Sequence, residues 1–419
     1  MDIKIKPSII SGEIKAIQSK SDAHRLLIAS SLSDKATKIQ LSTKSKDIIS
    51  TIDCLISLGA NIVEKDNYLY IYPINRQDDL IYLNFNESGS SFRFLLPVAT
   101  SLYNELNFSG EGRLPERPIK DLLFTLEENG VSFSSYKLPF KSKGKLVSGN
   151  FNLPGDVSSQ YISGLLLTAP LLNSDTKINV DGVIESSQYI DMTIDTLKKF
   201  DVEVIKDNNT FLIKRDSKYK TIQEEYKIEG DWSSAAFFLA AASLGGIVRY
   251  SNLNIESKQP DKIILKILNG FGSQIIFEND DIIVYPADFN NLDIDISQCP
   301  DLVPILAILA TKTDSTCYLR NGKRLRLKES DRLIATENMI NSLGGKAEIR
   351  DDDLIIYGTN GLVGGEVDSY MDHRIAMAAA IGSIVSREDI IIKNAQVVDK
   401  SYPNFFDDFK ALGGIYNVI

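Results

Sequence analysis

An apolar helix, a stop at glycine or aspartate and a β-branched strand follow one another six times along this chain of 419 residues. The stops lie 71, 71, 71, 72 and 69 residues apart, at Gly59, Gly130, Asp201, Gly272, Gly344 and Gly413. Glycine suits the position after a helix because it adopts positive φ without strain. This self-similarity indicates one α/β unit repeated six times.

Two further features recur within the unit. Four of the stops continue into a turn and a second strand, in the segments 65–73, 206–214, 278–286 and 350–358, which predicts hairpins.

A second, strongly apolar helix opens each unit behind small or acidic residues, which are good N-caps. These openings are Lys20-Ser21, Ser88-Gly89, Ser158-Ser159, Asp231-Trp232-Ser233, Pro300-Asp301 and Asp372-His373. Helices that are apolar nearly all round belong in domain interiors.

Six units predict two domains of three repeats more readily than one very large core. We place the boundary near 226–230, after the third repeat. Strand 3–5 precedes the first helix and the last repeat stops at its helix, so the N-terminal strand is expected to complete the C-terminal domain. The expected domains are therefore 18–228 and 1–17 with 229–419.

Charge and cysteine content exclude several classes of protein. The formal net charge is −10, which disfavours general binding to nucleic acids or to membrane surfaces. Three widely spaced cysteines without a CxxC, and only two histidines, disfavour disulfide scaffolds and zinc sites. The opening segment lacks the features of a signal peptide, and the longest apolar runs are too short to span a membrane. We expect a cytoplasmic protein.

Cations gather around the openings of the interior helices. The first four N–H groups of a helix lack intrahelical partners and attract anions. Lys20 and Arg25 accompany the first opening, Arg113 and Arg117 lie in a loop before a helix, and Asp372 and Arg374 flank His373. The segment 320–332 carries six lysines and arginines, with Glu329 among them, and such a carboxylate can serve as a proton carrier. Taken singly, each motif is equally typical of a capped helix or a solvated turn.

No Walker A motif, dinucleotide GxGxxG, HExxH or GxSxG occurs in the sequence. Nucleotide-driven phosphoryl transfer, dinucleotide redox chemistry and serine-hydrolase chemistry therefore lose support. What remains is a two-domain α/β protein that gathers cations for small anionic metabolites.

Nine segments, in order, resemble the motifs of the 5-enolpyruvylshikimate-3-phosphate synthase family of enolpyruvyl transferases. They are SKSDAHR, SGSSFR, PERPI, the SSQ at Ser158, SSQYID, PDLVPILA, LKESDRL, MDHRIAM and DKSYPNFF. The resemblance implies two domains, each of three βαβαββ repeats, arranged as an inside-out α/β barrel. It also implies transfer of the enolpyruvyl group of phosphoenolpyruvate to the 5-hydroxyl of shikimate 3-phosphate with release of phosphate, in aromatic amino acid biosynthesis. The family needs no cofactor or metal and is generally monomeric.

The resemblance assigns roles residue by residue. Asp301 is similar to the base for the 5-hydroxyl, Glu329 to the proton carrier at the methylene carbon, and Lys20 to a second catalytic group. The residues expected to bind shikimate 3-phosphate are Lys20, Ser21, Arg25, Ser158, Ser159, Gln160, Ser186, Tyr189, Asp301 and Lys328. The residues expected to bind phosphoenolpyruvate are Lys20, Gly89, Arg117, Gln160, Arg332, Arg374 and Lys400.

Departures from the family pattern occur at Ile17-Gln18, Glu87 and Arg324, and bear on affinity more than on the reaction. The alternatives are the UDP-N-acetylglucosamine 1-carboxyvinyltransferase, RNA 3′-phosphate cyclase and a non-catalytic anion-binding protein on the same scaffold. The first commonly has a cysteine where this chain has Gly112, and the net charge argues against the second. The third would not need Asp301 or Glu329.

Overall fold

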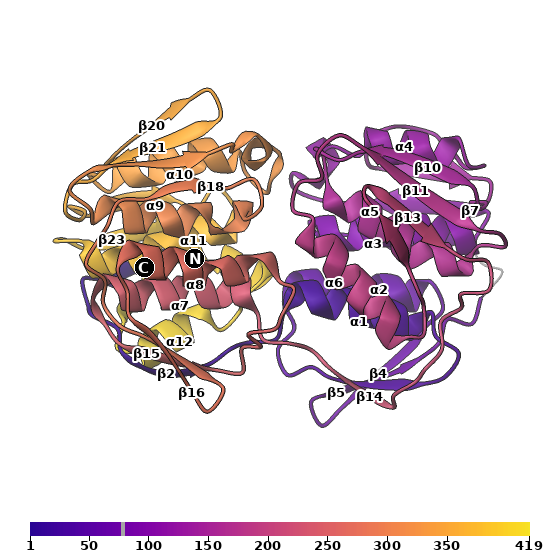
Figure 1. Cartoon of the computed structure of the whole chain (residues 1–419), viewed down its shortest axis with the longest axis horizontal. Coiled ribbons are helices and arrows are strands. Elements are labelled where there is room, and N and C mark those ends of the chain that lie inside the picture. Colours follow the sequence, from indigo (N-terminus) through magenta and orange to yellow (C-terminus); the bar gives the residue numbers. More distant parts are fainter. Residues whose placement is uncertain (77–79) are drawn as a thin grey trace. The chain divides into compact units, whose positions relative to one another are not determined.

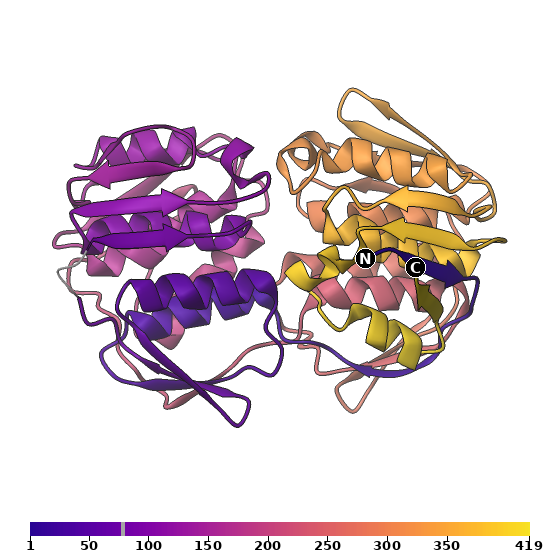
Figure 2. The same ribbon diagram turned by 180° about the vertical axis from the view of Figure 1, so that it is seen from behind.

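The computed structural model describes residues 1–76 and 80–419. The chain separates into two compact units: unit 1 comprises Met1–Ser19 and Glu229–Ile419, and unit 2 comprises Lys20–Ile228. Each unit has its own core of buried apolar side chains. Figures 1 and 2 show the elements of both units from opposite sides.

Unit 2 contains three four-stranded sheets, in the orders β14-β3-β5-β4, β6-β7-β9-β8 and β10-β11-β13-β12. Their strands are β3 Thr37–Gln40, β4 Asn61–Lys65, β5 Tyr68–Tyr72, β6 Ile81–Asn84, β7 Glu105–Ser109, β8 Ser132–Phe133, β9 Phe140–Lys143, β10 Asn150–Pro154, β11 Thr176–Asp181, β12 Ile205–Asp207, β13 Thr210–Ile213 and β14 Glu225–Lys227. In each sheet the first pair is parallel and the other two are antiparallel. This shared order is what a repeated unit predicts.

Unit 1 has the same pattern, in the orders β2-β15-β17-β16, β18-β19-β21-β20 and β22-β23-β1-β24. Its strands are β1 Ile3–Lys6, β2 Gly12–Lys15, β15 Val248–Ser251, β16 Ile275–Glu278, β17 Asp281–Val284, β18 Asp293–Asp295, β19 Thr316–Arg320, β20 Lys346–Arg350, β21 Asp353–Tyr357, β22 Gly365–Asp368, β23 Ile390–Lys393 and β24 Ile415–Val418. The N-terminal strand β1 pairs with both β23 and β24, so the first and last strands of the chain lie side by side (Figure 2). The N-terminal strand therefore completes the sixth repeat.

Two helices accompany each sheet. The interior helices are α1 Lys20–Ser31, α3 Gly89–Leu102, α5 Ser159–Thr168, α7 Trp232–Gly245, α9 Val303–Thr311 and α11 His373–Gly382. The outer helices are α2 Lys46–Ser57, α4 Lys120–Glu127, α6 Gln188–Lys199, α8 Ile264–Phe271, α10 Arg332–Ser342 and α12 Phe405–Ala411. Every residue of α9 and α11 is buried, which confirms that the apolar series lies inside.

Seven short 3-10 helices supplement these elements in the described chain: η1 Leu114–Glu116, η2 Ala169–Leu171, η3 Pro260–Ile263, η4 Pro300–Leu302, η5 Lys323–Leu327, η6 Ser383–Val385 and η7 Ala395–Lys400. All six expected helix stops have positive φ, from 62° at Asp201 to 110° at Gly272, as the position after a helix requires. The four expected hairpins form as β4–β5, β12–β13, β16–β17 and β20–β21. Across the described residues, no helix is both long and apolar enough to cross a membrane.

Candidate functional site

The openings of the interior helices carry the polar side chains of both units, and α10 adds to them in unit 1. In unit 1, Asp301 lies in η4 just before α9, Arg332 begins α10, and Asp372 caps α11, of which Arg374 is the second residue. Asp372 forms the cap because its Oδ1 accepts the Arg374 N–H at 3.0 Å. Three helix openings thereby bring acidic and basic groups into one cluster.

Arg332 is the centre of this unit 1 cluster, and its side chain is completely buried. Its Nη1 donates to Asp301 Oδ1 at 2.7 Å and its Nη2 donates to Glu329 Oε2 at 2.5 Å. Its Nε donates to Asp372 Oδ2 at 2.8 Å, and Nη2 also reaches Asp372 Oδ1 at 3.2 Å. The planar guanidinium therefore fixes three carboxylates at once, which a point-charge ammonium could not do.

Asp301 receives two further cations. Lys328 Nζ lies 3.2 Å from its Oδ1, and Arg374 Nη2 lies 3.2 Å from its Oδ2. Burial disfavours the ionised form of Asp301, but Arg374, Lys328 and Arg332 outweigh burial and hold its pKa well below its usual range. Burial in turn lowers the pKa of Lys328 to about 8, against the opposing effect of Asp301. Asp301 is thus ionised, and three neighbouring cations stabilise its negative charge.

A fourth carboxyl, Asp261 in η3, lies near this cluster without joining it. Ser233 donates to its Oδ2, whereas Oδ1 is buried without a hydrogen-bond partner among the described residues. Burial raises the pKa of Asp261 to about 6, and the charge on Asp301 adds to the effect. Asp261 therefore changes its charge near neutral pH, which Asp301 does not.

Lys400 ends η7 and is 9% exposed, and its Nζ lies 3.5 Å from Met371 O. Of the six lysines and arginines in segment 320–332, Lys328 and Arg332 form ion pairs with Asp301 in this cluster. Arg320 on β19 pairs with Asp293 on β18 at 2.7 Å with both side chains exposed, and Arg326 pairs with Asp331 and Asp352, each at 3.4 Å. The density of charge in this segment is therefore mostly a surface feature.

In unit 2, the opening of α1 carries the two expected cations. Lys20 Nζ forms an ion pair with Asp47 Oδ2 at 2.8 Å, and both side chains are largely buried. Arg25 is 2% exposed, and its guanidinium donates to neutral oxygens: Thr193 Oγ1 at 2.8 Å, Ser21 O at 2.6 Å and Tyr189 O at 2.8 Å. Burial lowers the pKa of Arg25 to about 10, and these oxygens aim the cation without neutralising it.

Two arginines converge on the opening of α3. A Cβ added at Gly89 would lie 2.7 Å from Arg117 Nη1 and 2.9 Å from Arg93 Nη1. Arg93 Nη1 also donates to Gln160 Oε1 at 2.9 Å, while Gln160 Nε2 donates to Ser90 Oγ at 2.8 Å. Gly89, Arg117 and Gln160 are thus brought together at the opening of α3.

Other expected residues of unit 2 lie on neighbouring openings. Ser158 caps α5, where its Oγ accepts the Gln160 N–H at 3.3 Å, and Ser159 is the first residue of that helix. Ser186 has a φ of 53° and precedes α6, on which Tyr189 lies. Arg25 links this region to α1 through Tyr189 O.

Three participants have no role assigned to them by the sequence argument. Asp47 pairs with Lys20, Asp372 pairs with Arg332, and Arg93 holds Gln160. Arg93 could have been found because it lies four residues after Gly89 in the same helix, and such residues share a helix face. The pairs Lys20–Asp47 and Arg332–Asp372 are 27 and 40 residues apart, so no local pattern indicates them.

The departure at Glu87 also has a defined place. Its carboxylate packs against Gly112, where an added Cβ would lie 1.8 Å from Glu87 Oε1. Any side chain at position 112 would therefore displace this carboxylate. In the loop after β7, a glycine therefore leaves room for the Glu87 carboxylate.

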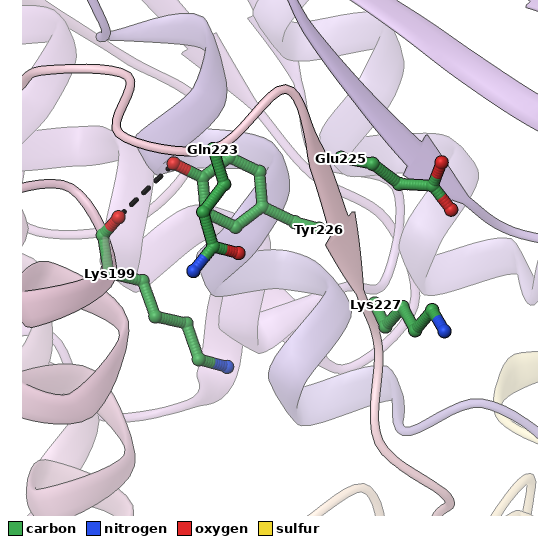
Figure 3. Close-up of a pocket in the computed structure, with 5 residues that line it drawn as sticks. All are labelled: Lys199, Gln223, Glu225, Tyr226 and Lys227. Carbon is green, nitrogen blue, oxygen red and sulfur yellow. Dashed lines mark hydrogen bonds between the residues drawn. The ribbon is translucent and has the colours of Figure 1, made fainter.

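A separate cavity of about 360 Å³ lies in unit 2, lined by Lys199, Gln223, Glu225, Tyr226 and Lys227 (Figure 3). Tyr226 OH donates to Lys199 O at 3.1 Å behind it. None of the expected site residues lines this cavity. The clusters described above are therefore distinct from this hollow.

Comparison with known proteins gives consistent matches over the whole chain. The sequence model of the family described as EPSP synthase (3-phosphoshikimate 1-carboxyvinyltransferase) matches residues 5–409. The 3-phosphoshikimate 1-carboxyvinyltransferase of Clostridium perfringens (strain ATCC 13124) is 44% identical over 419 residues, covering 98% of each chain. That of Clostridium beijerinckii is 41% identical over 431 residues, covering 99% of this chain and 98% of the relative.

Solved structures resemble this chain as well. An EPSP synthase from Acinetobacter baumannii superposes with a TM-score of 0.84 at 21% identity, and all of each chain is covered. The predicted mixed α/β fold of six repeats is thereby confirmed.

Proposed function

Because the chain belongs to the EPSP synthase (3-phosphoshikimate 1-carboxyvinyltransferase) family, we propose that the unit 1 cluster around Arg332 and the polar residues at the helix openings of unit 2 are its substrate-binding and catalytic groups. The protein is a transferase of aromatic amino acid biosynthesis. It moves the 1-carboxyvinyl group of phosphoenolpyruvate to the 5-hydroxyl of shikimate 3-phosphate and releases phosphate.

The reaction requires a proton to be added to a carbon and later removed. Protonation of the phosphoenolpyruvate methylene carbon develops positive charge on the adjacent carbon, which the 5-hydroxyl oxygen attacks while losing its proton. Expulsion of phosphate and loss of a methyl proton then regenerate the vinyl group on the new ether oxygen. The chemistry therefore needs one group that gives and retakes a proton at carbon and another that accepts the hydroxyl proton.

One observation carries the assignment of these two roles to unit 1. Arg332 contacts Asp301 and Glu329 through neighbouring guanidinium nitrogens, at 2.7 Å and 2.5 Å. We assign Glu329 to proton transfer at carbon and Asp301 to the hydroxyl proton. Lys20, held by Asp47 at 2.8 Å, is assigned to charge stabilisation and to part of the proton transfer. A protein that only bound anions would need neither carboxylate.

The remaining residues provide anion recognition. The residues assigned to phosphoenolpyruvate are Arg332, Arg374 and Lys400 in unit 1 and Lys20, Gly89, Arg117 and Gln160 in unit 2. Shikimate 3-phosphate is assigned to the openings of α1, α5 and α6 and to Lys328; the unit 2 residues are Lys20, Ser21, Arg25, Ser158, Ser159, Gln160, Ser186 and Tyr189. Substrates with two phosphates and two carboxylates in total suit this number of fixed cations.

We further propose that residues 18–228 and 1–17 with 229–419 are the domains, and that the protein acts as a cytoplasmic monomer. Size-exclusion chromatography with light scattering measures the oligomeric state directly. A dimer mass would contradict this part of the proposal.

Phosphate release on mixing the protein with shikimate 3-phosphate and phosphoenolpyruvate tests the function. UDP-N-acetylglucosamine, offered as the alternative acceptor, should release none. Lys20→Ala, Asp301→Ala and Glu329→Ala should each lose turnover by about 10²-fold or more, as expected for lost acid–base or charge-stabilising groups. Near-normal turnover in any of these variants would remove the role of that residue.

A further inference from the structure

Three of the four cations of unit 1 that we assign to substrate anions, Lys328, Arg332 and Arg374, are already engaged with a carboxylate. Asp301 accepts from Arg332 Nη1 at 2.7 Å, from Lys328 Nζ at 3.2 Å and from Arg374 Nη2 at 3.2 Å. The three cationic donors that bind the Asp301 carboxylate are also the donors that a substrate phosphate or carboxylate would need. An incoming anion therefore meets cations whose charge is in part compensated.

The carboxylates around Arg332 differ in how readily an anion could replace them. Asp372 is completely buried, accepts hydrogen bonds from Arg332 with both carboxylate oxygens and caps α11. Asp301 has a side chain that is 16% exposed, and it lies within η4 rather than at the N-cap position of a helix. Removing Asp372 would dismantle a helix start, whereas Asp301 can lose a cation to a ligand without breaking secondary structure.

We propose that Asp301 is the resident counter-ion of Lys328, Arg332 and Arg374, and that substrate anions bind by drawing these cations away from it. This inference rests on the proposed function and assigns Asp301 a second role beside that of base. In the ligand-free protein Asp301 competes with anions and lowers their affinity. Once an anion holds the cations, the carboxylate regains its ability to accept a proton.

The charge balance explains why the two roles belong together. A carboxylate held by three cations is a poor base, in line with the strongly lowered pKa of Asp301 in the ligand-free protein. An anion beside the same cations offsets their pull, so the pKa of Asp301 rises when the anion binds. Asp301 thus becomes basic when the reacting anion is in place, and linkage requires that a neutral residue at 301 raise anion affinity.

Binding of inorganic phosphate to the full chain, measured by calorimetry at fixed ionic strength, tests the inference without any turnover. Asp301→Asn should bind phosphate at least about tenfold more tightly than wild type, within the usual range of coupling between ligands that interact. Asp295→Asn is the matched control, because it removes one negative charge nearby. The Asp295 carboxylate accepts from Ser297 N and Asn321 Nδ2 instead, so its affinity for phosphate should remain that of wild type.

Equal or weaker phosphate binding by Asp301→Asn would overturn the inference, as would an equal gain in Asp295→Asn. Turnover is scored separately: a variant that binds phosphate tightly but keeps normal turnover supports the counter-ion role and refutes the base role. If Asp301→Asn does not fold, the infrared difference spectrum of wild type with and without phosphate decides instead. A shift of carboxylate stretching bands is expected, and an unchanged carboxylate region would overturn the inference.

Discussion

Replacing Asp372 with asparagine should destabilise unit 1 strongly while changing almost no atoms. Asp372 and Arg332 are both completely buried, and two oxygens of Asp372 accept from Nε and Nη2 of Arg332 at 2.8 and 3.2 Å. Asparagine has the same shape and is also a good N-cap, so α11 keeps its cap. The substitution therefore isolates the buried charge.

The size of the loss follows from the burial. Breaking a buried ion pair by removing one partner typically costs about 3–5 kcal/mol, because the other charge remains buried. Arg332 keeps Asp301 and Glu329 as partners, so we expect a loss near the lower end, about 3 kcal/mol in the free energy of unfolding. Exposed substitutions usually change this quantity by no more than about 0.5 kcal/mol.

Trp232 provides the assay. It is the only tryptophan of the sequence and is completely buried at the start of α7, so its fluorescence reports the unfolding of unit 1. Urea is the suitable denaturant because it is uncharged and does not screen ion pairs. The control is Asp368→Asn, whose carboxylate is exposed and accepts from Tyr370 N at 2.8 Å. A loss below about 1 kcal/mol in Asp372→Asn, or an equal loss in the control, would refute the reasoning.

Three further expectations follow from other contacts. Burial raises the pKa of Asp261 from 3.8 to about 6, so the contribution of the protonated Asp261 to stability is complete below pH 4 and is lost as pH rises through 6. Asp261→Asn should remove this pH dependence and should be more stable than wild type at pH 8, by on the order of 1–3 kcal/mol. Urea titrations at several pH values measure both effects. Equal pH dependence in variant and wild type would contradict it. Arg25→Lys should raise the KM for shikimate 3-phosphate by about tenfold or more, because an ammonium group cannot replace the planar guanidinium. Thr193→Val removes only one of the three oxygens to which Arg25 donates, so it should have a smaller effect. A larger rise in KM for Thr193→Val than for Arg25→Lys in steady-state kinetics would refute this prediction. Gly164→Ala should destabilise unit 2 by about 1–3 kcal/mol, because an added Cβ would lie 2.3 Å from Arg93 O where α5 packs on α3. Unfolding followed by circular dichroism measures the loss, and the control is Gly182→Ala, where φ is 78° but the added Cβ has no atom within 4 Å. A loss in Gly164→Ala no larger than that of the control would contradict the prediction.

The sequence predicted most of the fold because the deciding information is local. Each helix stop, N-cap and hairpin turn depends on residues within a few positions, and the repeat spacing shows them six times. Positive φ at Gly272 and Asp201, and the cap at Ser158, follow directly from residue type. Residues such as Asp301, Glu329 and Arg332 were found because motifs placed them at helix openings.

Only the tertiary structure decided which charge meets which. Arg374 reaches Asp301 across 73 residues, Arg332 reaches Asp372 across 40, and Arg93 reaches Gln160 across 67. The sequence predicted cations at helix tips that attract anions, but it did not predict that carboxylates already hold them. Periodicity determines which face of a helix a residue occupies, whereas the pairing of buried charges depends on how several helix ends pack together, and electrostatic energy changes steeply over those few ångströms.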